Sequence, residues 1–317
     1  MKNQLKNPKT LLLLLLTALM FVTPLFTDSR SVLMLFAQIY LFAIFALSYD
    51  LLMGYTGIIS FGHAMFFGIG AYSAGILLRI GDGAWTHFLL AIVVALLLSM
   101  VVSFIVGLIS LRLSHTFYAM ITLAFAELFF ILAEKWRSLT KGTDGFTFPV
   151  PSFFHDRLNF YYTCLILLIF IFLVLSRFVN SPVGRILQAI RENEQRTESL
   201  GYKVIHYKVL ATVYGGMIAS VAGILYAISL RFVNTAVFGV DKTLDALLMT
   251  IIGGTGTLYG AVLGSFVIEF AHKWLSELAD VHWIFERWMI LFGLVYILIV
   301  LFFPKGILGA FRRRKHS

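Results

Sequence analysis

The chain has 317 residues, of which 60% are hydrophobic and only 13% carry a charge. A soluble domain of this length needs more charge to cover its surface, so the composition excludes a water-soluble protein. A membrane crossing takes about 20 mostly apolar residues, so the length allows about ten crossings and leaves no room for a large soluble domain. The single cysteine, Cys164, excludes an intrachain disulfide.

The apolar pattern predicts an all-α polytopic membrane protein that forms one transmembrane domain over residues 1–317. Segments expected to cross the membrane follow in chain order at 11–26, 31–53, 57–78, 88–111, 117–133, 158–176, 210–230 and 283–303. A further apolar stretch, 243–271, is broken by glycines, and we expect two half-helices there that enter and leave on one side. The first segment lacks a cleavage pattern and is expected to be a retained helix rather than a signal peptide.

The distribution of charge predicts the orientation. The segments 1–10, 112–116, 177–209 and 304–317 together hold 15 Lys or Arg and 3 Asp or Glu, whereas the segments expected outside hold 10 of each. Basic residues gather on the cytoplasmic side of membrane proteins, so both termini are expected to be cytoplasmic. The net charge of +9 is explained in this way, and no nucleic-acid partner is expected. The basic tail 312–315 is expected to anchor the chain at the membrane surface or to contact anionic lipid.

Two glycine-rich segments, 54–62 and 253–260, interrupt the apolar pattern and resemble each other. Each follows Leu-Leu-Met and contains a Thr-Gly pair, an aromatic residue and another glycine. Non-helical backbone survives at membrane depth only against protein or water, so such breaks in the two halves of the chain indicate a transport path. Close helix packing through small residues is the alternative explanation. The candidate residues of the breaks are Gly54, Thr56, Gly57, Gly253, Gly254, Thr255 and Gly256.

Four ionisable side chains fall within the apolar segments, namely Asp50, His63, Glu127 and Glu269. Such groups are costly at membrane depth unless they face a cavity or a polar partner. Asp50 and His63 flank the first glycine segment, where they either line a polar path or cap the helix ends. Glu127 lies in mid-segment and is the best candidate for a polar contact inside the bundle. Asp50, His63 and Glu127 therefore join the candidate translocation path.

Residues 182–201 have the pattern of an amphipathic helix of about five turns on the expected cytoplasmic side. Ser181 is a good N-cap, Pro182 suits the first helical position and Gly201 supplies a stop. Apolar residues recur at 183, 186, 187 and 190, the spacing of one helix face. Such a helix either lies at the membrane interface or docks a cytosolic motor. The candidate docking residues are Gly184, Arg185, Ala189, Arg191, Glu192, Glu194, Leu200 and Gly201.

Sequence motifs for ATP hydrolysis, metal binding and nucleophilic catalysis are absent from the 317 residues. The glycine segment 253–260 lacks the lysine of a P-loop, so it is not suited to cradle phosphates. We expect no enzyme activity, no cofactor and no metal, and an ATPase, if one drives the protein, has to be another chain. The expected outside loop 134–157 is suited to contact a separate binding protein, although a loop of this length could be inert.

Four stretches resemble the permeases of branched-chain amino acid ABC transporters, specifically the LivM type. They are LSYDLLMGYTG at 47–57 with SFGHAMFFGIGAY at 60–72; TLAFAE at 122–127 with LTKGTDG at 139–145; the segment 184–201 with AIRENE at 189–194; and GGTGTLYG at 253–260 with the ending FFPKGILG at 302–309. They occur in one order over nearly the whole chain. At Lys141 the family more often has glycine, which is a small departure.

The resemblance implies a multi-pass importer subunit of the bacterial cytoplasmic (inner) membrane. It implies a homologous second permease of the LivH type, two cytosolic ABC ATPases and an extracytoplasmic solute-binding protein as partners, besides membrane lipid. It also implies that 184–201 is the coupling helix seated in an ATPase groove, and that transport proceeds by alternating access. Branched-chain amino acids are the expected substrate, although the family also serves urea, short amides and other amino acids.

A secondary transporter driven by H⁺ or Na⁺ is the main alternative. It would use the broken helices together with Glu127 or Asp50, and it would take up solute without any ATPase partner. The amphipathic segment 182–201 argues against it. An intramembrane enzyme is a third alternative, but the sequence lacks a paired nucleophile and base.

Overall fold

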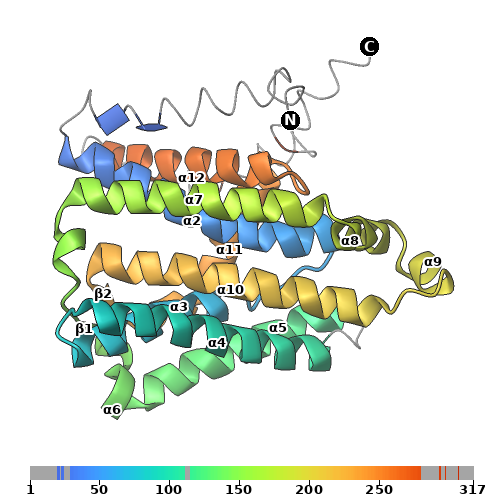
Figure 1. The fold of residues 1–317 in the computed structure, drawn as a ribbon, viewed down its shortest axis with the longest axis horizontal. Helices are drawn as coiled ribbons and strands as arrows, with labels where there is room; N and C mark the ends of the chain where they lie inside the picture. Colours follow the sequence, from blue (N-terminus) through green and yellow to red (C-terminus); the bar gives the residue numbers. More distant parts are fainter. Residues whose placement is uncertain are drawn as a thin grey trace.

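The structure is a computed structural model that describes residues 29–110 and 115–279, together with residues 20, 21, 23 and 24 and the isolated residues 293, 297 and 306. The described part is almost entirely helical, as expected for an all-α membrane protein, and its long helices run side by side (Figure 1). Most of the expected crossings 11–26 and 283–303 and both chain termini lie outside the described residues.

The elements, in chain order, are mostly helices of different lengths. They are α2 (Arg30–Thr56), α3 (Ala64–Ile80), α4 (Trp85–Ser110), α5 (His115–Lys135), α6 (Arg137–Thr140), η1 (Gly142–Asp144), β1 (Phe146–Thr147), η2 (Ser152–His155), α7 (Arg157–Val179), α8 (Pro182–Glu192), α9 (Glu194–Ser199), α10 (Val204–Leu230), β2 (Phe232–Val233), η3 (Thr235–Phe238), α11 (Val240–Gly253) and α12 (Leu258–Ala279). Within the described residues, 5 helices are long and apolar enough to cross a membrane, or up to 6 spans if the bent pair α11–α12 counts as one.

The helix α2 is the centre of the bundle. It is hydrophobic on all sides, which is typical of a helix that is buried all round. From Ile39 to Leu52 each side chain is at most 5% exposed, and the neighbours α7, α10, α11 and α12 all pack against it. The polar residues that α2 carries, including Asp50, are therefore held inside protein rather than against lipid.

The helix α4, in contrast, separates small residues from large apolar ones. Small side chains at every fourth position are buried against α3 and α10, and these are Ala91, Ala95, Ser99 and Ser103. Large apolar side chains point outward, among them Leu89, Val93, Leu97, Val101 and Phe104. This arrangement is the small-residue packing typical of helices in a bilayer, with one face on protein and the other on lipid.

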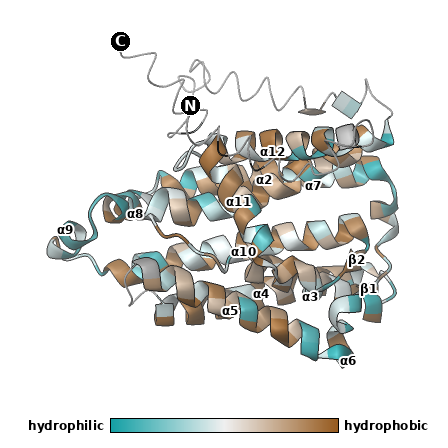
Figure 2. Ribbon diagram, turned by 180° about the vertical axis from the view of Figure 1, so that it is seen from behind, coloured by the Kyte–Doolittle hydropathy of each residue, from teal (hydrophilic) through white to brown (hydrophobic). Residues whose placement is uncertain are grey.

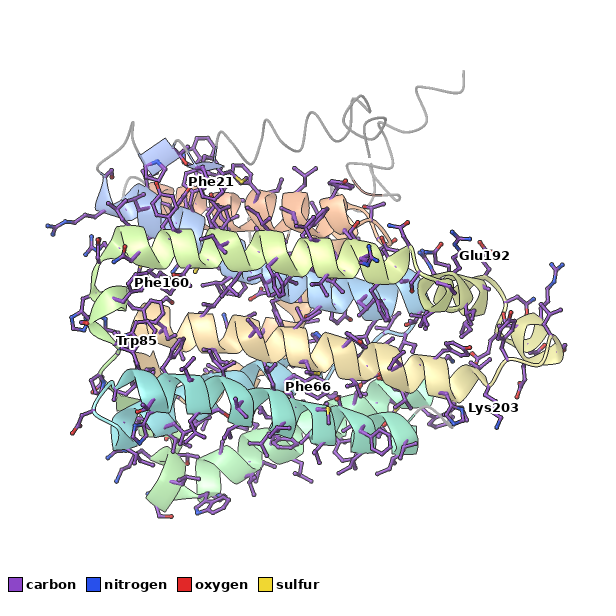
Figure 3. All side chains as sticks on the ribbon, viewed as in Figure 1. Phe21, Phe66, Trp85, Phe160, Glu192 and Lys203 are labelled. Atoms are coloured by element: carbon purple, nitrogen blue, oxygen red, sulfur yellow. The ribbon has the colours of Figure 1, made fainter. Side chains whose placement is uncertain are left out.

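Glycines bring α3 and α10 into backbone contact. A Cβ atom on Gly70 of α3 would overlap the carbonyl of Ser220 on α10, and a Cβ atom on Gly223 of α10 would overlap the carbonyl of Phe67 on α3. With 17 residues α3 is about 26 Å long, which is short of the hydrocarbon thickness of about 30 Å. Its first turn begins inside the bundle, because Phe66 lies midway between Trp85 at one end and Glu192 at the other (Figure 3).

The predicted crossing 57–78 therefore differs from the structure. Residues 57–63 are not helical, and the helix starts only at Ala64. The predicted break at 253–260 is confirmed, since α11 and α12 meet there at an angle of 115°. However, only α11, with 14 residues, is a half-length helix, because α12 has 22 residues and is long enough to cross.

The helices α10, α11 and α12 repeat the order of α2, α3 and α4. Each set has a long helix of 27 residues, a short one and another long one, and α2 and α10 run in opposite directions (Figure 1). The irregular segment 231–239 corresponds to 57–63 in this inverted repeat. The second glycine segment lies at the next junction, between α11 and α12. The likeness of the two glycine segments in sequence therefore does not mark equivalent places in the repeat.

Residues 134–157 form a folded cap rather than a free loop. The strands β1 and β2 pair antiparallel, with Phe146 opposite Val233, and the guanidinium of Arg79 lies 5.1 Å from the ring centre of Phe146. Lys141 has a positive φ of 62°. Glycine adopts this backbone conformation without strain, which explains physically why glycine suits the position better than lysine.

Candidate functional site

The first glycine segment ends α2. Gly57 takes a left-handed conformation with φ of 74°, the N–H of Ile58 returns to the carbonyl of Leu52 at 3.1 Å, and the hydroxyl of Thr56 donates to the same carbonyl. This is a glycine-terminated helix end in which the last carbonyls keep partners. The following loop packs on α5, where Phe61 N–H donates to the hydroxyl of Thr122 at 3.2 Å.

The second glycine segment turns the chain between α11 and α12. Gly254 and Gly256 have φ of 120° and 76°, values that side-chain-bearing residues rarely adopt. The turn is closed by the hydroxyl of Thr257, which donates to the carbonyl of Gly254 at 2.7 Å. Gly253 packs directly on the backbone of Gly260, so the helices leave the turn in close contact. Thr255 is partly exposed beside them.

The structure brings the two glycine segments together. The N–H of Gly256 donates to the Oδ1 atom of Asp50 at 2.7 Å, and Asp50 is fully buried. A Cβ atom on Gly54 would overlap both that carboxylate oxygen and the N–H of Gly256, so the contact requires glycine. The other oxygen of Asp50, Oδ2, is buried without a hydrogen-bond partner in the described part of the chain.

Arg191 of α8 completes this contact. Its Nη1 atom donates to the carbonyl of Gly54, and its guanidinium is in electrostatic contact with Asp50. Its Cγ atom is also the nearest neighbour of a Cβ atom built on Gly57, at 3.2 Å. We call the group of Asp50, Gly54, Gly256 and Arg191 the glycine junction. It joins α2, α8 and the α11–α12 turn, and it includes residues from both predicted sets, docking and translocation.

His63 lies apart from the glycine junction, although it flanks the same glycine segment in sequence. It is fully buried, its Nε2 atom is 2.8 Å from the hydroxyl oxygen of Ser48, and its ring is 5.5 Å from that of Phe45. The next residue starts α3, where the N–H of Ala64 donates to the hydroxyl of Thr243 on α11 at 2.9 Å. His63 therefore marks the place inside the bundle where the first turns of α3 and α11 meet.

The predicted cytoplasmic helix 182–201 is two helices in the structure. Ser181 caps α8 as predicted, with its hydroxyl accepting from the N–H of Gly184 at 3.3 Å. Asn193 then breaks the helix, because its backbone is extended and its side chain accepts from the N–H of Arg196 at 2.9 Å to start α9. The prediction of a single helix of about five turns was therefore wrong, because α8 has 11 residues and α9 has 6.

One face of α8 is buried and the other is open. Leu187 and Ile190 pack against Val204 and Ala211 of α10. The open face is a stripe at helical spacing, which we call the α8 stripe, consisting of Arg185, Gln188, Ala189 and Glu192.

The other predicted docking residues fall into two groups. Gly184 is buried against the backbone of residues 178 and 179, and Glu194 pairs with Lys208 of α10 at 2.7 Å. These two residues hold the helices in place. Leu200 and Gly201 are exposed beyond α9, away from the α8 stripe.

Glu127 does not make the interior contact that was predicted for it. It is exposed on α5, among exposed apolar side chains such as Met120, Leu128 and Ile131. Within the described part of the chain, Glu127 forms no hydrogen bond or ion pair. A carboxylate on this face of a membrane helix requires a polar surrounding that lies outside the chain's own core.

Sequence reasoning missed a charged cluster at the first turn of α11. Lys242 pairs with Asp245 at 3.8 Å, and Glu269 of α12 is near enough to influence both electrostatically. Of these residues, only Glu269 was singled out from the sequence. The signal that could have found them is the Lys–Asp spacing of three residues on a short helix that follows an irregular segment.

Comparisons with known proteins match most of the chain. Residues 31–301 match the family described as the permease component of branched-chain amino acid transport systems. The high-affinity branched-chain amino acid transport system permease protein LivM of Escherichia coli (strain K12) is 26% identical over 297 residues, which cover 84% of this chain and 68% of that protein. A probable LivM permease of Methanocaldococcus jannaschii is 25% identical over 323 residues, covering 84% and 90% of the two chains.

The permease protein LivH of Salmonella typhimurium is similar at a comparable level, with 24% identity over 287 residues that cover 84% of this chain and 91% of that protein. No solved structure matches the chain. The matched residues include α2 to α12, and therefore the glycine junction, the α8 stripe and the charged cluster. The chain belongs to the family of branched-chain amino acid transport permeases, and within that family it resembles the LivM type.

Proposed function

We propose that this chain is one of two membrane subunits of an ABC importer that carries branched-chain amino acids across the bacterial cytoplasmic membrane. Its expected partners are a second, LivH-like permease, two cytosolic ATPases and an extracytoplasmic solute-binding protein. Residues 1–317 would form one permease domain with both termini in the cytoplasm. The observation that supports the proposal most directly is the set of contacts made by Arg191. They connect α8 to the two helix breaks inside the bundle.

The charge distribution supports a cytoplasmic position for α8. The segment 177–209 is rich in Lys and Arg, and such segments stay on the cytoplasmic side. Glu192 and Lys203 lie at one end of the bundle and Trp85 and Phe160 at the other (Figure 3). The α8 stripe would then face the cytosol, with two charged side chains around the small Ala189. This surface suits a protein partner better than a bilayer, because it carries both signs of charge and no large apolar residue.

The glycine junction gives this docking surface a mechanical consequence. A push on α8 reaches the end of α2 through Arg191 and the α11–α12 turn through Gly256. Both places have left-handed glycines, which permit the backbone to change direction. ATP-driven closure of the ATPases would thus tilt α2 and α11 against each other and open the path on alternate sides.

Co-purification of the tagged chain from its native membrane tests the docking surface. We expect a P-loop ATPase and a second permease to co-purify with the wild-type chain. The double reversal Arg185→Glu with Glu192→Arg should lose the ATPase and keep the second permease. These two residues are preferable to Arg191, because reversal of Arg191 would also break its bond to Gly54.

A matched control reverses charge at the other end of the bundle. Glu134 and Arg137 are likewise an acid and a base on the surface of one region, and they lie in the folded cap, far from α8 (Figure 1). Glu134→Arg with Arg137→Glu should leave the ATPase bound. If the wild type purifies alone or only with copies of itself, the importer proposal fails, and an ion-coupled transporter becomes the better explanation.

A further inference from the structure

Lys242, Asp245 and Glu269 form a partly exposed cluster of charged side chains on α11 and α12, and we keep the name charged cluster for them. The ammonium of Lys242 lies 3.8 Å from the carboxylate of Asp245, one turn further along α11. Glu269 comes from α12 and is near enough to influence both electrostatically. His272, one turn beyond Glu269, is in electrostatic contact with Lys242.

The depth of the charged cluster is fixed by the aromatic rings under Lys242. The ammonium lies 5.3 Å from the ring centre of Phe42 and 5.3 Å from that of Tyr226. Phe42 is more than three turns from either end of α2, which places it about 18 Å from the nearer end. Where α11 begins, hydrophilic residues interrupt a ribbon that is otherwise mostly apolar (Figure 2). The charged cluster therefore lies near the middle of the membrane.

The charges of the cluster do not balance. One ammonium faces two carboxylates, and Asp241 places a third carboxylate, which is exposed, in the same first turn of α11. Charge at membrane depth is expensive unless a partner compensates it. The ammonium group of a solute would be one such partner for the second carboxylate.

The charged cluster is also within reach of a solute. The side chains of Lys242 and Asp245 are 23% and 32% exposed, whereas Asp50 and His63 are not exposed at all. The rings of Phe42 and Tyr226 add faces that attract a cation. A small molecule can therefore contact these groups without opening the packed core around α2.

We propose that the charged cluster binds the ammonium and carboxylate groups of a free amino acid in transit, with Glu269 and Asp245 taking the ammonium and Lys242 the carboxylate. This inference rests on the proposed function and narrows its substrate class. It selects α-amino acids, which carry both charges, over urea and amides, which carry neither. The aliphatic side chain of the solute would be left without a dedicated pocket, so the cluster would not distinguish leucine from valine.

The test uses the complete transporter, reconstituted in vesicles with radiolabelled leucine and an excess of the binding protein. Lys242→Met and Glu269→Gln should each lower the initial uptake rate about tenfold, because each removes a charged contact to the solute. ATPase activity stimulated by the binding protein should stay within about twofold of the wild type, since the α8 stripe is unchanged. Lys203→Met is the matched control, because Lys203 is exposed at the end of the bundle, and it should keep normal uptake (Figure 3).

A double variant separates a binding role from a structural one. Lys242→Met with Asp245→Asn removes both members of the ion pair, so the complex should assemble even if Lys242→Met alone does not. Uptake should remain about tenfold low in the assembled double variant. Wild-type uptake by the double variant would overturn the inference and leave the proposed function intact. If the wild-type complex itself takes up no leucine with ATP, the proposed function fails, and this inference fails with it.

Discussion

Arg191 of α8 donates a hydrogen bond to the backbone carbonyl of Gly54 in the last turn of α2. The two residues are 137 positions apart, and their bond ties a helix at the end of the bundle to the helix at its centre. Because Gly54 also lies against Gly256, the same bond reaches the turn between α11 and α12. A force applied to α8 therefore acts on both helix breaks at once.

Arg191→Ala should separate ATP hydrolysis from transport. The α8 stripe stays intact, so we expect the ATPase to co-purify and to hydrolyse ATP. Uptake should fall about tenfold or more, since a hydrogen bond from a charged donor contributes roughly 1.5–3 kcal/mol. Arg191→Lys should recover only part of the uptake, because a compact ammonium does not reproduce the position and planar geometry of the guanidinium that donates to Gly54. Equal uptake by the wild type and Arg191→Ala would show that α8 transmits motion in some other way.

Gly256→Ala should destabilise the protein through two effects that a control can separate. The residue has φ of 76°, and a Cβ atom there would meet the guanidinium of Arg191 and the carbonyl of Gly54. Gly201 has φ of 89° but nothing within 4 Å of a Cβ atom, so Gly201→Ala carries the backbone strain alone. That strain is worth about 1–2 kcal/mol.

Thermal unfolding of the purified protein measures the difference between the two glycine variants. Gly256→Ala should lower the melting temperature by several degrees more than Gly201→Ala. A melting temperature that is equally low in both variants would mean that the glycine junction is loose enough to admit a methyl group.

Asp50→Asn and Asp50→Ala should differ in stability. The carboxylate accepts the N–H of Gly256 at 2.7 Å, and the side-chain oxygen of asparagine can accept it too. Alanine leaves that N–H without an acceptor, which costs about 1–3 kcal/mol. Hydrogen exchange at the Gly256 amide would report the change directly. We expect protection close to wild type in the asparagine variant and much lower protection in the alanine variant; loss of protection in both would point to the charge of Asp50 instead.

The sequence predicted the helices of the bundle well, because a bilayer forces each crossing into one long apolar run. It also located the bend at Gly253–Gly256, since three glycines in four residues rarely continue a helix. The break at Asn193 was harder to predict. Asparagine within a polar segment is compatible with a helix interior, and only its side-chain bond to the N–H of Arg196 shows that it caps a new helix.

Contacts between distant segments could not be predicted from one sequence. Asp50 and Gly256 were each singled out, but their bond depends on how α2 and α11 pack. Lys242 was not singled out, because it lies just before the apolar stretch 243–271, and only the fold brings its ammonium against the rings of Phe42 and Tyr226. Local sequence patterns therefore determine where the helices form, whereas tertiary packing determines which polar residues contact one another.

Glu127 offers a prediction about what covers α5. Its carboxylate is exposed on a membrane helix, beside Met120 and Leu128, and lipid alone would be an expensive surrounding. We expect Glu127 to face a water-filled path or the second permease of the assembled importer. Glu127→Gln should then keep most of the ATP-driven uptake, because the amide is also polar, whereas Glu127→Leu should lower it several-fold.

The same pair of variants tests a proton role for this carboxylate. If Glu127 carried protons, Glu127→Gln would abolish uptake or change its dependence on pH, since the amide does not titrate. Uptake into vesicles measured between about pH 5 and about pH 8 should instead have the same profile in the wild type and in Glu127→Gln. Tm measurements on both variants control for stability. Loss of uptake in the glutamine variant with unchanged Tm would favour an ion-coupled transporter over the importer proposed for this chain.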